Sequence, residues 1–352
     1  MVLINGKFLA QKITGVQRVA FEIVKRLDLD LQFLRNTDPR IVSPKEIVNT
    51  HVFENIPHIK KGKHSPFWEY TILSMEAAKH RAHVFSFSSG FPITASSGLY
   101  FMHDVTFLRV PESFSRGFRM LYKSVFKYVE SQRKVIVLTN SEFSKREILS
   151  FFPKMKDRIY VVPIGYEHVI DVPRRQEIFE ALGLEPRSYY LTVATLNRHK
   201  NLGIVIQAAR IRREERFVVV GMKPSVTVFK EANILDVPDN VLFTGYLSDN
   251  DLVTLLENSK GLIFPSIYEG FGLPALEALA LDVPLILSDI PVFREIYGEV
   301  ACFFNPHDEK ELAKKMGEAS TPSRQAKAKV LSTYSWERSV KAIIDIWLTR
   351  SV

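Results

Sequence analysis

The stretch LIFPSIYEGFGLPALEALA occupies residues 262–280, and it is the part of the sequence that decides the fold class. A short run typical of a buried strand passes through a glycine-containing turn directly into a helical pattern. Gly270 and Gly272 let the backbone approach a ligand closely, and Pro274 suits the first position of the helix. Since free N–H groups at the start of a helix attract anions, the stretch predicts a cradle of diphosphate size.

The same alternation of short apolar strands and longer helical patterns continues on both sides of this stretch. It is typical of βαβ units around a parallel sheet, and therefore of an α/β protein. Strands are expected at residues 84–87, 99–102, 135–139, 159–162, 190–194, 217–220, 241–244, 261–264 and 284–287, and helices at residues 16–27 and 116–131.

The length of 352 residues and a hydrophobic content of 46% favour two globular domains over one. The stretch from Pro163 to Pro186 contains Gly165, Pro173 and a run of mixed charge, which indicates a junction. We expect an N-terminal domain over residues 1–170, a C-terminal domain over 171–335 and a final helix over 336–352, with Ser335 as its N-cap.

Composition limits the classes of partner and compartment. The formal net charge of +8 attracts anions such as nucleotide phosphates, anionic lipid head groups or nucleic acid. The single cysteine excludes an internal disulfide and fits a reducing cytoplasm. With no apolar stretch long enough for a signal peptide or a membrane span, we expect a cytoplasmic protein.

Two carboxylates, Glu269 and Glu277, lie on either side of the glycine turn with seven residues between them. Because a carboxylate accepts two hydrogen bonds at once, each of them can hold a vicinal diol such as a ribose or a hexose. The alternative is a glycine-rich turn with a surface pair of glutamates. The right order of strand, turn and helix favours the ligand site.

This string resembles the paired-glutamate motif of the retaining glycosyltransferases of family 4. The resemblance covers most of the chain and implies the GT-B fold, in which two Rossmann-like domains with parallel sheets face an interdomain cleft. Further matching motifs are Gly15-Val16-Gln17-Arg18, Met102-His103-Asp104, Thr139–Ser144, Val193–Leu202 and Ser288-Asp289-Ile290-Pro291.

The resemblance implies a role for each matching donor-site residue. Glu277 would hold the ribose, Glu269 the donor sugar, and Gly15 would bring backbone near the donor phosphates. The backbone that contacts the sugar would come from Gly270, Phe271, Gly272 and Leu273.

His103 would contact the donor sugar and its developing positive charge. The alternative is a structural histidine beside Asp104. Lys200 would neutralise the leaving diphosphate, since a fixed cation lowers the barrier to a step that builds negative charge; the alternative is a charge beside a helix cap. The order Arg198-His199-Lys200 departs from the family's usual Arg-Lys-Asn and leaves open whether Arg198 or His199 contacts phosphate.

Two Asp-x-Asp triplets, Asp28-Leu29-Asp30 and Asp249-Asn250-Asp251, are the residues that could hold a divalent metal. Each is expected at a helix end, where aspartate serves as an N-cap or a surface residue. We therefore predict no metal and no cofactor; a UDP-sugar or GDP-sugar enters as the donor substrate.

The segment from Ser115 to Tyr128 carries Arg116, Arg119, Lys123 and Lys127 at helical spacing among aromatic residues. Such a helix can lie on an anionic membrane, and the loop of residues 60–68 adds lysines and Trp68 as an anchor. The alternative is a helix with one buried and one solvated face. We expect peripheral contact with the inner face of the cell membrane.

These expectations describe a retaining, metal-independent hexosyltransferase. It would transfer mannose, rhamnose, glucose or a similar sugar to a polyprenyl-linked or glycan acceptor in cell-surface polysaccharide synthesis, such as that of lipopolysaccharide. One alternative is a UDP-sugar epimerase of the same fold. The other is a non-catalytic protein that binds nucleotides or nucleic acid, and only the high pI favours it. We expect no nucleic-acid partner.

Overall fold

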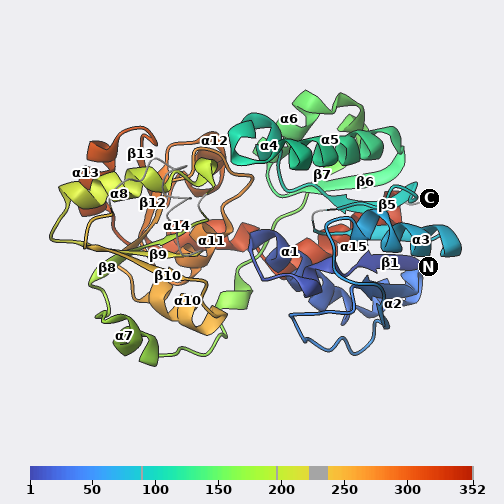
Figure 1. Cartoon of the computed structure of the whole chain (residues 1–352), viewed down its shortest axis with the longest axis horizontal. Coiled ribbons are helices and arrows are strands. Elements are labelled where there is room, and N and C mark those ends of the chain that lie inside the picture. Colours follow the sequence, from blue (N-terminus) through green and yellow to red (C-terminus); the bar gives the residue numbers. More distant parts are fainter. Residues whose placement is uncertain (89, 196, 222–236, 351–352) are drawn as a thin grey trace. The chain divides into compact units, whose positions relative to one another are not determined.

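The computed structural model describes residues 1–88, 90–195, 197–221 and 237–350. Leu196, part of the matching motif Val193–Leu202, lies outside this range. The chain groups into two compact units, each built on its own parallel sheet (Figure 1). The first unit consists of Met1–Val105, Ser115–Gly165 and Tyr334–Val352, and the second of Thr106–Phe114 and Tyr166–Thr333.

The described part of the first unit has a seven-stranded parallel sheet in the order β3-β2-β1-β4-β5-β6-β7. Its strands are β1 (Val2–Asn5), β2 (Pro39–Ser43), β3 (His58–Lys60), β4 (His83–Ser86), β5 (Ser97–Phe101), β6 (Lys134–Thr139) and β7 (Ile159–Val161). Its α-helices are α1 (Gly15–Leu27), α2 (Leu31–Thr37), α3 (Ile72–His80), α5 (Arg116–Ser131), α6 (Glu142–Phe151) and α15 (Trp336–Arg350). Its short 3-10 helices are η1 (Lys7–Ala10), η2 (Trp68–Tyr70) and η4 (Pro153–Arg158).

The second unit has a six-stranded parallel sheet over its described residues, in the order β10-β9-β8-β11-β12-β13. Its strands are β8 (Tyr189–Val193), β9 (Arg216–Val220), β10 (Val241–Gly245), β11 (Gly261–Phe264), β12 (Leu285–Ser288) and β13 (Ala301–Phe304). Its α-helices are α4 (Thr106–Arg109), α7 (Glu177–Leu182), α8 (Leu202–Ile211), α10 (Asp249–Glu257), α11 (Leu273–Ala280), α12 (Pro291–Tyr297), α13 (Glu309–Glu318) and α14 (Arg324–Thr333). Its 3-10 helices are η3 (Pro111–Ser113), η5 (Glu167–Val169) and η6 (Arg198–Lys200).

Strand order places the ligand edge of each sheet. In the first sheet the order reverses between β1 and β4, and in the second between β8 and β11. Ligands of open α/β sheets bind beyond the carboxyl ends of the strands at such a reversal. The loops after β1, β4, β8 and β11 are therefore where binding residues are expected.

The local sequence explains most of these elements. The four residues of β1 and the four of β11 are all buried, as expected for strands covered on both faces. Helix α5 begins where the Ser115 hydroxyl accepts a hydrogen bond from the Phe118 N–H at 3.2 Å. The expected helix at 116–131 and the expected strand at 261–264 are confirmed at both ends.

The last helix, α15, completes the first unit. The Ser335 hydroxyl accepts from the Arg338 N–H at 3.1 Å, which confirms the expected N-cap. Trp347 packs edge-on against Phe85 of β4, with 4.8 Å between the ring centroids. Trp336 lies beneath the guanidinium of Arg26 in α1. Figure 1 shows this C-terminal helix among the N-terminal elements of the unit.

Trp68 is not the surface anchor that the loop of residues 60–68 predicts. Its side chain is buried, and its indole N–H donates to the Lys61 carbonyl at 2.8 Å. The loop folds over the ring because a buried indole needs an acceptor for its N–H, and its own backbone supplies one. The neighbouring Phe67 is the exposed aromatic residue. The expectation for Trp68 is therefore wrong.

Among the described helices, none combines the length and the apolar character that spanning a membrane requires.

We predict that Trp347→Ala destabilises the first unit by about 3–5 kcal/mol, because removing a buried indole leaves a cavity beside β4. The replacement Lys341→Ala, on the exposed side of the same helix, is the matched control and should change stability by less than about 0.5 kcal/mol. Urea unfolding followed by circular dichroism measures both. Equal effects of the two variants would show that α15 does not stabilise the unit through its buried face.

Candidate functional site

The loops after β8 and β11 bring two of the predicted catalytic residues into contact. Lys200 closes η6 after β8, and Glu269 lies in the turn after β11. The Lys200 Nζ atom is 2.5 Å from the Glu269 Oε1 atom, and the two side chains are 20% and 12% exposed. The Lys200 ammonium also lies 5.6 Å from the centroid of the Phe264 ring. An ion pair thus stands at the point where the strand order of the second sheet reverses.

His199 ties the loops around this pair together. Its carbonyl accepts a hydrogen bond from the Ile267 N–H at 2.9 Å. Its own N–H donates to the Ser113 hydroxyl at 3.0 Å, and its ring stacks on Phe114 with 5.8 Å between centroids. His199 is therefore buried among these loops, whereas Arg198 is exposed. Of the two residues that the sequence left open for a phosphate contact, Arg198 is the one at the surface.

The backbone conformation at position 272 favours glycine. Its φ angle of +93° lies in the left-handed region, and a Cβ atom there would come within 2.6 Å of the Phe293 ring. Its carbonyl accepts from the Tyr297 hydroxyl at 2.9 Å. Because Gly272 is the N-cap, α11 begins at Leu273, and Pro274 takes the second position and not the predicted first.

The residues of the turn are buried. Phe271 and Leu273 are 3% and 6% exposed and belong to the core, and Gly270 is buried as well. The expected contact between the backbone of residues 270–273 and a sugar stays a prediction.

Glu277, the second glutamate of the motif, lies within α11, where its Oε1 atom accepts a hydrogen bond from the His168 Nε2 atom at 2.8 Å. The side chains of His168 and Glu277 are 4% and 14% exposed. In the described structure, the Glu277 Oε2 atom makes no hydrogen bond or ion pair. The sequence did not point to His168, because the two residues are 109 positions apart and no motif includes the histidine.

Three buried hydroxyl groups accompany these carboxylates at the carboxyl ends of neighbouring strands. Thr195 follows β8, Ser266 follows β11, and Ser288 is the last residue of β12. Among the described residues, none of their side-chain oxygens has a hydrogen-bond partner. Buried hydroxyls usually have a partner. Their concentration at one edge of the sheet favours a polar ligand there.

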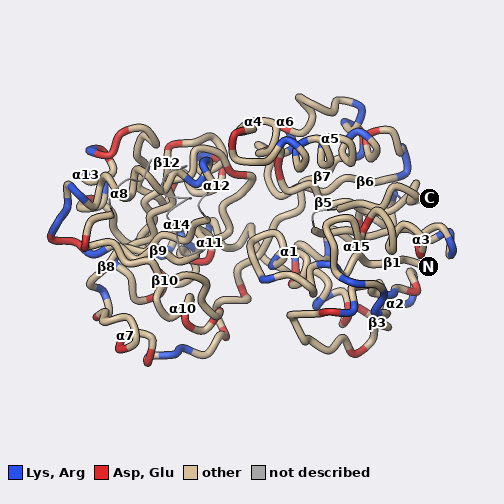
Figure 2. Tube along the Cα trace, viewed as in Figure 1, with Lys and Arg blue, Asp and Glu red and all other residues tan. Residues whose placement is uncertain are grey.

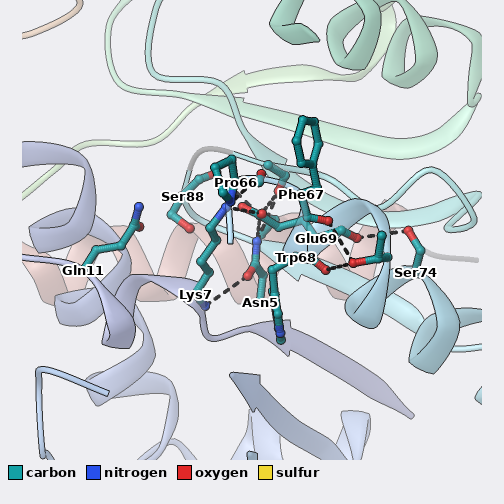
Figure 3. A network of polar contacts seen from close by, with 12 residues as sticks. Asn5, Lys7, Gln11, Pro66, Phe67, Trp68, Glu69, Ser74 and Ser88 are labelled. Atoms are coloured by element: carbon teal, nitrogen blue, oxygen red, sulfur yellow. Dashed lines mark hydrogen bonds and ion pairs between the residues drawn. The ribbon is translucent and has the colours of Figure 1, made fainter. Parts of the chain in front are cut away.

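The corresponding edge of the first sheet carries a buried ion pair that sequence reasoning missed. Lys7, just after β1, pairs with Glu69 and also donates to the Pro66 carbonyl at 3.3 Å (Figure 3). Asn5 at the end of β1 donates to the Ser86 hydroxyl at the end of β4, at 2.9 Å. Burial raises the pKa of Glu69, and Lys7 opposes that shift. The ion pair joins η1, which follows β1, to η2, which follows β3, and the Asn5–Ser86 hydrogen bond joins the ends of β1 and β4.

His103 lies just beyond β5 in the first unit, the position expected from the sequence. Its Nε2 atom donates to the Phe87 carbonyl at 3.0 Å, and its ring stacks on Phe101. Burial lowers the pKa of His103, and the Phe87 carbonyl and the Asp104 carboxylate only partly offset this effect. The neutral ring is favoured, with Nε2 protonated and Nδ1 as the acceptor.

Gly15 is the first residue of α1. An added Cβ atom there would meet no atom within 4 Å. The packing of the chain therefore does not require glycine at this position, which fits the expected approach of a ligand. Gly15 and His103 belong to the first unit, and Lys200, Glu269 and Glu277 to the second. The expected cleft shared by both sets of residues stays a prediction.

The Asp-x-Asp triplets match the expected N-cap and surface roles only in part. Asp30 is the N-cap of α2, as expected. Asp28 is buried and accepts hydrogen bonds from the backbone N–H groups of Glu54, Asn55 and Ile56. Asp249 and Asp251 lie in the first turn of α10, whose N-cap is Ser248. The predicted absence of a metal stays a prediction.

One segment of the chain matches a known protein family. Residues 174–334 match the family model of the glycosyl transferases group 1. This segment is therefore a glycosyl transferases group 1 domain. The matched segment includes Lys200, Glu269 and Glu277.

Several similar curated proteins are named as mannosyltransferases. The chain is 28% identical over 250 residues to the serotype-specific mannosyltransferase WbdA of Escherichia coli, covering 65% of this chain and 30% of that protein. It is 30% identical over 214 residues to the O-antigen chain mannosyltransferase RfbU of Salmonella typhimurium, covering 59% and 57%. It is 27% identical over 280 residues to the MMP alpha-(1->4)-mannosyltransferase of Mycolicibacterium hassiacum, covering 73% and 65%. The chain thus spans less than two thirds of the length of each.

Solved structures confirm the fold. The chain superposes on WaaG, a glycosyltransferase involved in lipopolysaccharide biosynthesis, with a TM-score of 0.72 and 16% identity, covering 98% of this chain and 99% of that one. It superposes on Anabaena Alr3699/HepE, solved with UDP and glucose, with a TM-score of 0.73 and 15% identity, covering 99% of both chains. With the two parallel sheets, these similarities confirm the predicted GT-B fold.

We predict that acid destabilises the first unit partly through His103. Because its folded pKa lies below the ordinary value of 6.5, the unfolded chain binds a proton more readily, and stability is lost as the pH falls below that value. Each unit of difference corresponds to about 1.4 kcal/mol. His103→Gln, which keeps an N–H donor, should flatten this dependence in thermal unfolding between pH 7 and 5. The exposed control His64→Gln should not; identical pH profiles for His103→Gln and the wild-type protein would contradict the assignment.

Proposed function

We propose that this chain is a glycosyltransferase that moves a hexose from a nucleoside diphosphate sugar to a hydroxyl of a glycan or polyprenyl-linked acceptor. The observation that carries the proposal is the contact between Lys200 and Glu269 at the strand-order reversal of the second sheet. It puts a cation and a diol-binding carboxylate together beside the start of α11. A sugar joined to two phosphates needs both kinds of group.

The donor would lie along the edge formed by the loops after β8 and β11. Lys200 would pair with the diphosphate, and Arg198, exposed in the same loop, would supply a second positive charge. Glu269 would exchange its contact with Lys200 for hydroxyls of the sugar, and the backbone of residues 270–273 would contact the same sugar. Glu277 would accept hydrogen bonds from the two ribose hydroxyls.

The transfer step would retain the anomeric configuration. As the bond between the sugar C1 atom and the phosphate oxygen breaks, its electron pair stays on the phosphate, where Lys200 stabilises the charge. The acceptor hydroxyl attacks C1 from the same face and gives its proton to the departing phosphate oxygen. The products are a glycoside and a nucleoside diphosphate. This step uses Lys200 in place of a divalent metal.

Mannose is the hexose that the comparisons favour, because the relatives reported above are named as mannosyltransferases. We therefore propose GDP-mannose as the donor to test first, with UDP-glucose as the second. Two of these relatives are named for O-antigen or serotype, and we propose a cell-surface polysaccharide as the product.

We predict that the protein releases GDP from GDP-mannose when a polyprenyl-linked acceptor extract is present, and that Lys200→Met lowers kcat by about 10²- to 10³-fold. The methionine keeps the length of the side chain and removes its charge, so the donor Kd should change far less than kcat. Lys314→Met removes a lysine that is 75% exposed on α13 and is the matched control. Full activity of Lys200→Met would overturn the assigned role.

The same assay tests the remaining parts of the mechanism. The product should show retained configuration by NMR, and excess EDTA should leave the rate unchanged. A covalent sugar trapped on a glutamate or aspartate would overturn same-face attack. Conversion of a UDP-sugar to its epimer without an acceptor would instead identify the enzyme as an epimerase.

We also propose that α5 places the protein on the inner face of the membrane. The buried side of the helix is formed by Val125, Phe126 and Val129, and Met120 is 71% exposed. The exposed charges Arg116, Lys123 and Lys127 lie along the remainder of the helix (Figure 2). A basic helix that also exposes apolar side chains suits anionic head groups.

We predict that the protein sediments with phosphatidylglycerol vesicles but not with phosphatidylcholine vesicles. Lys123→Glu combined with Lys127→Glu should abolish most of this binding, because each basic residue near an anionic surface contributes about 1 kcal/mol. Lys310→Glu combined with Lys314→Glu makes the same charge change on α13 and should leave it intact. Equal losses in both pairs would show that net charge, and not α5, drives binding.

A further inference from the structure

His168 is a buried side chain that the proposed transfer step does not use. It lies in η5, shortly after the chain enters the second unit at Tyr166. Val169, the next residue, packs in one apolar cluster with Ala280 of α11. Ala280 is one helical turn beyond Glu277, so this packing fixes η5 against the helix that carries the carboxylate. The apolar packing of the adjacent Val169 thus holds the backbone beside His168 against α11.

The hydrogen bond between His168 and Glu277 fixes one half of the carboxylate. The Nε2 atom donates to Oε1 at 2.8 Å, and the ring is only 4% exposed. A glutamate on a helix surface ordinarily samples several rotamers, and ordering a long side chain costs free energy. Because the buried His168 ring holds Oε1, the Glu277 side chain loses this conformational freedom when the protein folds and not when a ligand binds.

The geometry of the remaining oxygen fits a ligand. Within the described residues Oε2 has no hydrogen bond or ion pair, although the Glu277 side chain is only 14% exposed. A carboxylate oriented through one oxygen directs the lone pairs of the other in a fixed direction. Residues that orient a binding group in this way act through it and do not touch the substrate.

We propose that His168 is a positioning residue for the donor nucleotide: it orients Glu277 so that the carboxylate receives the ribose hydroxyls of a nucleoside diphosphate. This inference rests on the proposed function, since it needs a nucleotide at Glu277. Under this proposal, His168 affects only the binding of the ribose, because Glu277 would not bind the base, the phosphates or the donor sugar.

Two variants separate the hydrogen bond from the packing. His168→Gln places an amide nitrogen where Nε2 stands and keeps a donor, whereas His168→Phe fills similar space without one. Thermal unfolding without ligand shows whether each variant folds. The two variants share the loss of the imidazole, so a difference between them reports the donated hydrogen bond.

The test measures the Kd of GDP and UDP and of their 2′,3′-dideoxy forms by calorimetry. The wild-type protein should bind the better ribonucleotide at least tenfold more tightly than its dideoxy form. His168→Phe should weaken ribonucleotide binding about fivefold and dideoxynucleotide binding less than twofold, and His168→Gln should restore most of the loss. In turnover, His168→Phe should raise the donor KM with kcat nearly unchanged.

The outcomes distinguish the two proposals. If the wild-type protein binds neither GDP nor UDP, the proposed function fails and this inference with it. If it prefers the ribonucleotide but His168→Phe binds it normally, or loses affinity equally for both forms, the proposed function stands and the role of His168 is overturned.

Discussion

The contact between Lys200 and Glu269 is the constraint on which the second unit's site depends. Each group is mostly buried, and a buried charge without a partner costs several kcal/mol. The two side chains come from different loops, so neither loop can adopt another arrangement without exposing or isolating a charge. The ion pair therefore joins the two loops at this edge of the sheet, and under the proposed function the phosphates and hydroxyls of the donor would each replace one half of it.

Two further carboxylates are also held by a partner from a distant part of the sequence. Glu277 is held by His168 from a different segment, and Lys7 is paired with Glu69 at the edge of the first sheet. In each case an ionisable side chain near a strand end or helix start meets its partner from a remote part of the chain. Such pairing keeps polar groups satisfied in the interior and sets the direction in which they point.

The sequence predicts what is encoded locally. Helix α5, strand β11, the Ser335 cap and the order of strand, glycine turn and helix around Glu269 all follow from short patterns, and the structure confirms them. Short sequence patterns do not predict which distant residues come into contact. Lys200 and Glu269 are 69 residues apart and meet only because parallel strands align their carboxyl ends. The prediction for Trp68 was wrong for the same reason. An aromatic residue among lysines indicates a membrane anchor, and only the tertiary fold shows that Trp68 is buried.

The short stretch Thr106–Phe114 has a consequence for how the two units of this protein could be recombined with those of a relative. It lies in the first half of the sequence but groups with the second unit, where Ser113 and Phe114 support His199 beside the Lys200 loop. The two halves are thus not separable by one cut near Gly165. A hybrid that exchanges the donor half between enzymes must carry this stretch with it, or the transplanted loop loses the acceptor for its backbone amide.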